Sequence, residues 1–302
     1  MIVDEIKLYD ADILTIQELD NFDEFYKQIF TELGYQVEYY CHPSKRHGCG
    51  IVYKKNKYTK VDYDTINYDL DTLCSPSVLT GNIGQLIALR LSDQPNTGFV
   101  IGNTHLYWRP SSNYERCRQT IIYANRLLEF RSQLAKDISW ISFLNGDFNT
   151  TPDDPVYALL TTNEFTQDIV ENLAESRLIT LQKKDGLEEE EEEKVESDRI
   201  IITEDVDTAE KLLAKYNKTK WTSIYSHFGK IGPPELVGLF GEPKFTDYAS
   251  QFKGTLDYMF VDAPVIIKQL LTPPKEEYLK PSLPNKHFGS DHLCLIADIE
   301  FQ

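Results

Sequence analysis

The chain has 302 residues, of which 41% are hydrophobic and 12% are aromatic, so it can bury the sizeable core of a globular domain. Its formal net charge of −17 argues against a protein that binds nucleic acid electrostatically over its whole surface. No run approaches the ~18 consecutive apolar residues of a membrane-spanning helix, and the five cysteines contain no CxxC pair, which argues against a zinc ribbon or a disulfide framework.

The first predicted elements are strands with one helix among them. Residues 11–19, ADILTIQEL, are typical of a buried strand that ends at Gln17-Glu18. Apolar residues at spacings of three and four then predict a helix over 21–33, with Gly34 as its stop. Further strands, bounded by turn residues, are predicted at 36–41, 49–54, 58–64, 85–91 and 98–107.

The middle of the chain predicts a long helix over about 113–136. Ser112 followed by Glu115 is a capping-box signature for its N-terminus. Its apolar stripe consists of Ile121, Ala124, Leu127, Leu128 and Leu134. The strand WISFL and a short helix after Pro155 follow, and the last strands are expected at 255–262 and 294–301. Many strands with few helices, in mixed order, predict an α/β fold of two packed sheets with helices outside.

Nothing in the sequence divides the chain, so we expect a single domain over 1–302 with a disordered insertion at about 171–218. Within that insertion, residues 185–198 hold nine acidic residues and one lysine, a composition that cannot bury apolar area. The first residues lack the basic and apolar regions of a signal peptide. We therefore expect an intracellular protein, cytoplasmic or nuclear, with a mitochondrial location left open and no membrane partner.

Polar side chains stand where several apolar strands end. The strand WISFL runs into NGDFN, so Asp147 and Asn149, two residues apart, are expected to face the same way. A polar turn is the ordinary alternative. Glu18 similarly ends the first strand, His105 lies within GFVIGNTHLYW, and Asp257 lies within GTLDYMFV.

Asp291 and His292 open the last strand and complete this set. Each residue alone has a structural explanation, but an unsatisfied buried polar group costs ~1–3 kcal/mol, so several together indicate one convergent site. Carboxylates with an amide suit Mg²⁺, and imidazoles can donate to phosphate oxygens. No GxSxG motif, Walker A loop or dinucleotide fingerprint is present. The set is typical of metal-assisted phosphoester hydrolysis with water as the nucleophile.

Five motifs in order carry a family resemblance: QELD, NTHLYW, NGDFNTTPDD, GTLDYMFV and GSDHLCL resemble those of the endonuclease/exonuclease/phosphatase superfamily. The segments HLYWRP and GEPKFTDYASQFKGTLDY are similar to the branch of the carbon-catabolite-repression deadenylases, Nocturnin and Angel. The resemblance spans nearly the whole chain apart from 171–218. It implies a DNase I-like, four-layer α/β sandwich of two mixed β-sheets flanked by helices. It also implies a Mg²⁺-dependent 3′→5′ exoribonuclease, often one that prefers poly(A).

The resemblance implies roles for the matched residues. Glu18 would be the metal ligand, with Mg²⁺ as the expected ion and Mn²⁺ as an alternative. Asp147 would orient or deprotonate the attacking water, and Asn149 would bind the scissile phosphate. Pro110 and Phe252 would contact the base at the RNA 3′ end, and poly(A) is a candidate substrate. The alternative for these two residues is a structural role, as an ordinary loop proline and a core phenylalanine.

The remaining matched residues would act on the phosphate. His105 and His292 would contact it, Asp291 would hold His292, and Asp257 would complete the polar network. Two alternative hypotheses for the function remain: a phosphatase or phosphodiesterase acting on a small nucleotide, and a non-catalytic interaction protein.

The chain departs from the family pattern at two places. His47 stands in KRHGCGIVY where the family usually has aspartate, which predicts an altered base or sugar preference. The family's opening strand, whose asparagine helps to hold the metal, has no counterpart here, from which we expect a fragment or an impaired member. Several cations could offset the acidic charge where the substrate binds: Lys45, Arg46, Arg109, Arg116 and Arg118. For Arg116 and Arg118, the alternative is that they are ordinary charged residues on the surface of the long helix.

Overall fold

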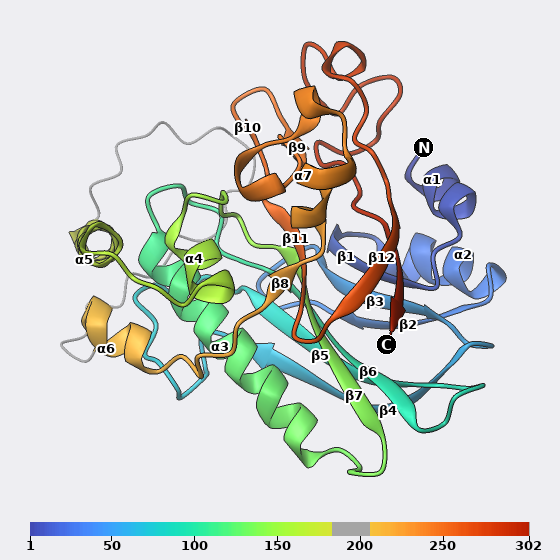
Figure 1. The fold of residues 1–302 in the computed structure, drawn as a ribbon, viewed down its shortest axis with the longest axis horizontal. Coiled ribbons are helices and arrows are strands. Elements are labelled where there is room, and N and C mark those ends of the chain that lie inside the picture. The colour runs from blue at the N-terminus through green and yellow to red at the C-terminus, as the bar shows by residue number, and fades with distance from the viewer. Residues whose placement is uncertain (183–205, 302) are drawn as a thin grey trace.

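The computed structural model describes residues 1–182 and 206–301, which form four layers: helices, a six-stranded sheet, a second layer of strands, and a further pair of helices (Figure 1). The acidic run over 185–198 lies outside the described residues. Across the described part of the chain, no helix has both the length and the apolar character needed to cross a membrane.

The six-stranded sheet is the centre of the fold. Its strands, in spatial order, are β4 (Tyr58–Asn67), β5 (Ile83–Leu91), β6 (Thr97–His105), β7 (Ser139–Asp147), β11 (Asp257–Val261) and β8 (Thr222–Ser223). Neighbours are antiparallel except β6 and β7, which are parallel and are joined by the long helix α3 (Asn113–Gln133). A parallel pair needs such a crossover connection.

The second layer of strands has two antiparallel pieces. One piece has the order β1 (Ile13–Leu19), β3 (Gly48–Lys54), β2 (Tyr35–Tyr40), and the other is the pair β12 (Val265–Leu270) and β13 (Ala297–Phe301). Both pieces pack on one face of the six-stranded sheet through a shared apolar core. That core includes Ile51, Tyr53, Ile87, Leu89, Phe99, Ile101, Phe143 and Val261, with Ile13, Ile267, Ile299 and Phe301 at its margin.

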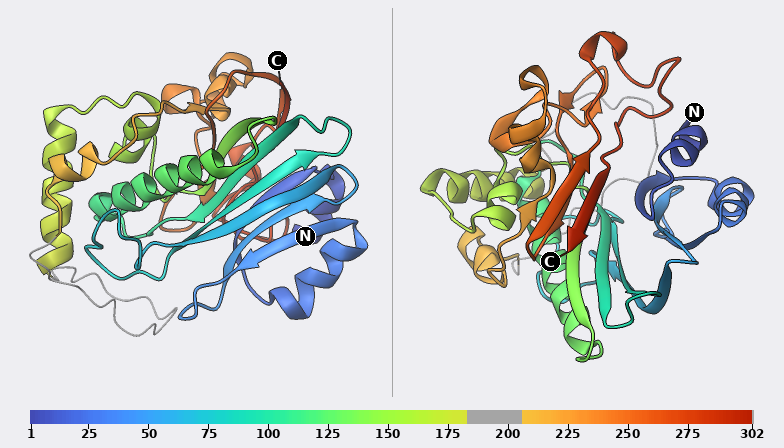
Figure 2. Two further views of the ribbon diagram at one scale, coloured as in Figure 1. Left: turned by 90° about the horizontal axis from the view of Figure 1, so that it is seen from below. Right: turned by 45° about the vertical axis from the view of Figure 1, so that its right-hand side comes forward.

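Helices cover the outer face of each layer of strands. On the outer face of the six-stranded sheet lie α3 and α4 (Pro155–Thr161), and α5 (Gln167–Gln182) and α6 (Ala209–Ala214) pack beside α3 (Figure 2). On the three-stranded piece lie α1 (Ile2–Tyr9), the π-helical turn η1 (Phe22–Tyr26) and α2 (Lys27–Glu32). The expected four-layer α/β sandwich is therefore present.

Short elements connect the later strands. They are the 3₁₀ turns η2 (Tyr225–His227), η3 (Pro234–Leu236), η4 (Leu239–Gly241) and η5 (Glu276–Tyr278), the helix α7 (Phe228–Ile231), and the two-residue strands β9 (Asp247–Tyr248) and β10 (Lys253–Gly254). Figure 1 shows β9, β10 and α7 beyond one end of the six-stranded sheet.

Two expectations about α3 and its surroundings are wrong in part. The segment 171–218 is not disordered throughout, because α5 extends into it, α6 lies within it, and Leu173, Leu212 and Leu213 are buried in the same core as the apolar residues of α3. The capping box is also absent: the Ser112 side chain makes no capping hydrogen bond. Glu115 instead points into the interior, where it forms an ion pair with Arg118.

Candidate active site

The register of three neighbouring strands places the first polar residues side by side. His105 on β6 is paired with Asp147 on β7, and Asp147 is paired in turn with Asp257 on β11. Paired residues project from the same face of a sheet, so these side chains form a row across the end of the sheet. His105 Nε2 lies 3.5 Å from Asp147 Oδ2. The strand-end residues that the sequence singled out therefore do converge.

His292 reaches this row from the segment before β13. Its Nδ1 is 2.8 Å from Asp257 Oδ2, and its Nε2 is 3.8 Å from Asp147 Oδ2. The partner expected for His292 was Asp291, and this role belongs to Asp257 instead. Adjacent residues of an extended segment point to opposite sides, and Asp291 contributes its backbone carbonyl, which accepts the N–H of Tyr248.

The sequence reasoning missed two residues that support the row. Thr246 Oγ1 accepts the backbone N–H groups of Leu256 and Asp257, at 3.0 and 3.1 Å, which fixes the start of β11. Its neighbour Asp247 is buried, and its Oδ2 lies 4.0 Å from His292 Nε2. The available signal was an aspartate followed by tyrosine in KFTDYAS, as at Asp257 in GTLDYMFV, although the flanking residues are less apolar.

Asn149 reaches the site differently from the prediction. The strand ends at Asp147, and Asn149 lies beyond it with a left-handed backbone, φ +48°. Its N–H donates to Asp147 Oδ1 at 2.8 Å, which is a polar turn, and its Nδ2 donates to the carbonyl of Leu106 at 2.9 Å. Two-residue strand periodicity therefore does not explain its position, although it remains in contact with Asp147.

Glu18 approaches from the other layer of strands. The pairing of β1 with β3 shifts register between Ile16 and Leu19, and Glu18 has φ +55°, a region that glutamate rarely adopts. The Glu18 side chain is 60% exposed, and its Oε1 lies 4.0 Å from His105 Nδ1. The irregular strand end thus turns an exposed carboxylate toward the row.

A buried polar network joins the two strands that carry Glu18 and His105. Asn103, two residues before His105, is fully buried, and its Nδ2 donates at 3.1 Å to the carbonyls of Ile16 and of Gly50. Its Oδ1 accepts from Gln17 Nε2 at 2.6 Å. These bonds tie β1 and β3 to β6 immediately behind the site.

The surroundings shift the pKa values of the two histidines in opposite directions. Burial lowers the pKa of His105, so its imidazole is neutral at pH 7. Burial also disfavours the charge of His292, but the carboxylates of Asp257, Asp147 and Asp247 together raise its pKa to about 11, so it is an imidazolium. Burial, and then the charge of Asp257, raise the pKa of Asp147 well above its usual value.

The donor set fits a hard divalent cation. Asp147, Asp257 and His292 each offer a ligand atom within 4.8 Å of the others. Two of these donors are carboxylates, and Glu18 adds a third carboxylate from across the site. Oxygen ligands of this kind suit Mg²⁺, which retains several waters. The imidazolium of His292 is better suited to a phosphate oxygen than to a metal.

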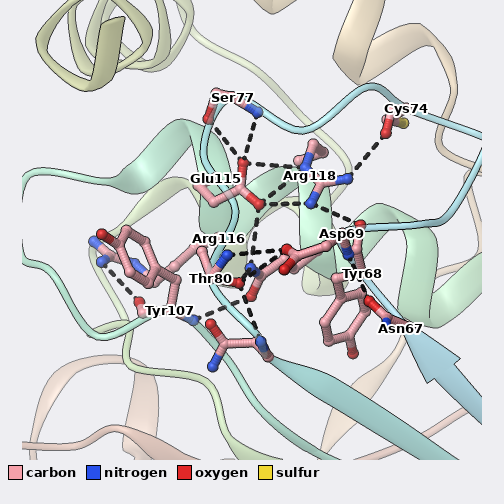
Figure 3. Close-up of polar contacts among 12 residues, drawn as sticks. Asn67, Tyr68, Asp69, Cys74, Ser77, Thr80, Tyr107, Glu115, Arg116 and Arg118 are labelled. Atoms are coloured by element: carbon pink, nitrogen blue, oxygen red, sulfur yellow. Dashed lines mark hydrogen bonds and ion pairs between the residues drawn. The ribbon is translucent and has the colours of Figure 1, made fainter. Parts of the chain in front are cut away.

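Two arginines expected at the cleft are buried structural residues instead (Figure 3). Arg118 chelates the Glu115 carboxylate and donates to the carbonyls of Cys74 and Tyr68, at 2.9 and 3.0 Å. Arg116 donates to the carbonyls of residues 107, 109 and 110. Because loops lie against the N-terminal half of α3, the polar side chains over 113–120 are enclosed rather than exposed.

The residues proposed to contact a base lie in loops. Pro110 follows β6, and its carbonyl accepts from Arg116 Nη2 at 2.9 Å. Phe252 lies in the turn between β9 and β10, is 39% exposed, and covers Gly254 so closely that a Cβ there would lie 2.6 Å from its ring. Trp108, beside Pro110, is 62% exposed. The base-binding role of Pro110 and Phe252 stays a prediction.

The chain belongs to the endonuclease/exonuclease/phosphatase family, which residues 1–292 match. Endonucleases, exonucleases and phosphatases all hydrolyse phosphate esters, so the expected class of enzyme, a phosphoester hydrolase, is confirmed.

Particular relatives confirm the branch and the fold. The chain is 28% identical over 370 residues to the RNA exonuclease NGL2 of Saccharomyces cerevisiae, a match that covers all of this chain and 72% of that protein. ANGEL2, described as a 2′,3′-cyclic phosphatase, superposes with a TM-score of 0.73 at 22% identity, covering 99% of this chain and 84% of that one. The human Nocturnin catalytic domain gives a TM-score of 0.65 at 19% identity, covering 100% and 85%.

Proposed function

We propose that this protein is a Mg²⁺-dependent 3′→5′ exoribonuclease that removes nucleotides from the 3′ ends of RNA. The observation that carries the proposal is the cross-strand row of His105, Asp147 and Asp257, completed by His292. The similarity to a protein named as an RNA exonuclease supports RNA as the substrate. Mn²⁺ could replace Mg²⁺, because both are bound by carboxylate oxygens.

Each residue of the row has a role that its environment supports. The imidazolium of His292, oriented by Asp257, would donate to a non-bridging phosphate oxygen as negative charge develops. Asp147, whose raised pKa suits a general base, would orient and deprotonate the attacking water. The neutral His105 and the amide of Asn149 would hold the phosphate. A bound divalent cation would supply Lewis-acid polarisation of the phosphate, and the carboxylates of Glu18, Asp147 and Asp257 would hold that cation.

A preference for adenine at the 3′ end is part of this proposal. Pro110 and Phe252 offer apolar surfaces at which a base could stack, an interaction worth ~1–3 kcal/mol per base. Phe252→Ala and Pro110→Ala should then reduce the discrimination between oligoadenylate and the other homopolymers more than they reduce overall turnover. An equal loss on all four homopolymers would contradict a role in base recognition.

A second candidate activity is the hydrolysis of a terminal phosphate. It is favoured by the structural similarity to ANGEL2, described as a 2′,3′-cyclic phosphatase. The same row could act on a cyclic phosphate at the end of an RNA, because both reactions are hydrolyses of a phosphate ester in which negative charge develops on the phosphate oxygens.

One experiment separates the two activities. Purified protein is incubated with 5′-labelled RNA that ends in a 3′-hydroxyl, and in parallel with the same RNA ending in a 2′,3′-cyclic phosphate, with Mg²⁺ and with EDTA. An exonuclease shortens the first RNA one nucleotide at a time and is inhibited by EDTA. Opening or removal of the cyclic phosphate without shortening would favour the phosphatase. No reaction on either RNA would favour the non-catalytic interaction protein.

A further inference from the structure

A basic loop lies beside the candidate active site and has no role in the row of catalytic candidates. The loop connects β2 to β3 and has the sequence HPSKRH over residues 42–47. We propose that Lys45, Arg46 and His47 form a second phosphate subsite, which binds the RNA backbone phosphate immediately 5′ of the scissile one. The proposal rests on the exoribonuclease function proposed above.

The loop is held in one shape by its own polar groups. The Cys41 thiol lies 3.2 to 3.4 Å from the carbonyls of His42, Lys45 and His47. The Lys45 N–H donates to the His42 carbonyl at 2.9 Å, and the His42 ring is 2.7 Å from Ser44 Oγ. A fixed loop presents its charges to a ligand at a small entropic cost, which is the benefit of preorganisation.

Two contacts place the loop next to the row. The His47 and His105 ring centroids are 6.3 Å apart. The Lys45 side chain lies along the turn at Gly81, with its Cε 3.3 Å from the position that a Cβ on Gly81 would occupy. The next residue, Asn82, donates from Nδ2 to the His105 carbonyl at 2.9 Å. Lys45 and His47 therefore flank His105 from the loop side.

The loop carries two cations, Lys45 and Arg46, in a chain with an excess of acidic residues. The chain has 31 Lys and Arg residues against 48 Asp and Glu, yet neither Lys45 nor Arg46 forms a salt bridge or a side-chain hydrogen bond with any residue that the structure describes. Half-buried Lys45 and exposed Arg46 are thus available to an anion. Guanidinium and ammonium groups are the usual partners of phosphate oxygens.

The proposed reaction identifies which phosphate of the RNA the second subsite binds. In a 3′→5′ exonuclease the scissile phosphate is the last internucleotide linkage, and only a nucleoside with a free hydroxyl lies 3′ of it. Any further phosphate of the substrate lies on the 5′ side, and the nearest one is a single nucleotide away. A basic loop beside His105 therefore has one adjacent backbone phosphate to bind.

The test measures binding in EDTA, so that the metal needed for cleavage is withheld. A 5′-fluorescein-labelled oligoadenylate is titrated with wild type, with the Lys45→Gln/Arg46→Gln double variant, and with Arg46→Gln alone. Because the Arg46 side chain is exposed, Arg46→Gln should leave folding intact. Lys55→Gln is the matched control, because Lys55 is exposed and lies at the opposite end of β3. A second oligonucleotide carries a neutral methylphosphonate at the penultimate linkage.

The double variant should bind roughly tenfold more weakly than wild type, the effect of losing a charge-assisted contact. For the double variant, the slope of log K against the logarithm of the salt concentration should be shallower by ~0.7, the value for one phosphate contact on a single strand. The methylphosphonate should weaken the wild type and Lys55→Gln, and should have little further effect on the double variant.

Equal weakening of wild type and double variant by the methylphosphonate would overturn the subsite, as would binding by the double variant equal to that of Lys55→Gln. Trimming assays on the same proteins separate the two proposals. Binding that depends on Lys45 and Arg46 without trimming by the wild type would retain the subsite and reject the exonuclease. Trimming with no such dependence would reject the subsite alone, and a wild type that neither binds nor trims RNA would reject both.

Discussion

Glu18 illustrates how a single backbone conformation can serve a site at the expense of stability. At φ +55° it adopts a left-handed conformation that glutamate tolerates poorly, at a cost of ~1–2 kcal/mol. A strained residue persists only where its surroundings impose it, and such residues cluster at functional sites. The strain turns the Glu18 carboxylate toward His105.

Glu18→Gly should therefore stabilise the metal-free protein by ~1 kcal/mol while removing metal-dependent turnover, because glycine adopts positive φ without strain. Glu18→Ala is the control, since it removes the carboxylate but retains the strain. Urea unfolding in EDTA measures the stability, and RNA hydrolysis with Mg²⁺ measures the activity. A glycine variant no more stable than the alanine variant, or one that retains near wild-type turnover, would contradict this account.

Glu242 is a second residue held in an unfavourable state. It is fully buried, and its Oε1 accepts the hydroxyl of Tyr157 at 2.8 Å. Burial raises its pKa from 4.5 to about 7. Between these values the folded chain retains a proton that the unfolded chain releases, so the free energy of unfolding falls as pH rises through this window. The shift corresponds to roughly 3 kcal/mol above pH 7.

Glu242→Gln should remove this dependence, because the amide still accepts from Tyr157 but does not ionise. Relative to the wild type, the variant should therefore become more stable to unfolding as the pH rises from 4.5 to 7.5. The exposed Glu235 provides the control substitution Glu235→Gln. Thermal or urea unfolding across this pH range provides the measurement, and parallel pH profiles of variant and wild type would show that Glu242 is not the group responsible.

At the scale of the elements, strands and helices follow from local pattern, but their partners do not. The run WISFL predicts β7, and its polar end marks Asp147. That Asp147 lies beside His105 and Asp257 depends on pairing between strands far apart in the chain, which no local spacing encodes. The wrong assignment of Asp291 to His292 has this cause.

Helix α3 shows the same limit. Ser112 and Glu115 have the spacing of a capping box, and the pattern alone cannot reveal that a loop covers this turn of the helix. Once the loop is in place, Glu115 is enclosed and needs a buried partner, which Arg118 supplies. The family resemblance identified the motifs of the site, whereas the burial of Arg116 and Arg118 became evident only from tertiary contacts.

Asn103 adds a buried polar link to the apolar packing between the two layers of strands. Asn103→Leu should destabilise the protein by ~2–4 kcal/mol, because the carbonyls of Ile16 and Gly50 would lose buried donors. It should also weaken Mn²⁺ binding, measured by electron paramagnetic resonance without RNA, since β1 carries Glu18. Asn145→Leu is the matched control: Asn145 pairs with Asn103 across the strands, and its Oδ1 has no hydrogen-bond partner among the described residues. Equal effects of the two substitutions would contradict the coupling.

The whole molecule assembles one site from distant parts of the chain. Glu18 comes from one layer of strands, His105, Asp147 and Asp257 come from the six-stranded sheet, and His292 comes from the segment before β13 (Figure 1). Despite the large negative charge of the chain, the site has cationic partners for an anionic substrate, because His292 and the loop over 42–47 lie beside its carboxylates.

The most direct test of this account compares two aspartate-to-asparagine substitutions six residues apart. Asp147 is buried in the row, whereas Asp153 is exposed and accepts a hydrogen bond from Thr151. Mg²⁺-dependent shortening of 5′-labelled RNA should fall roughly 10²–10⁴-fold in Asp147→Asn, the range typical of a lost general base, and should stay near the wild-type rate in Asp153→Asn. Both variants should unfold as cooperatively as the wild type. Turnover by Asp147→Asn equal to that of Asp153→Asn would contradict the assignment of the site.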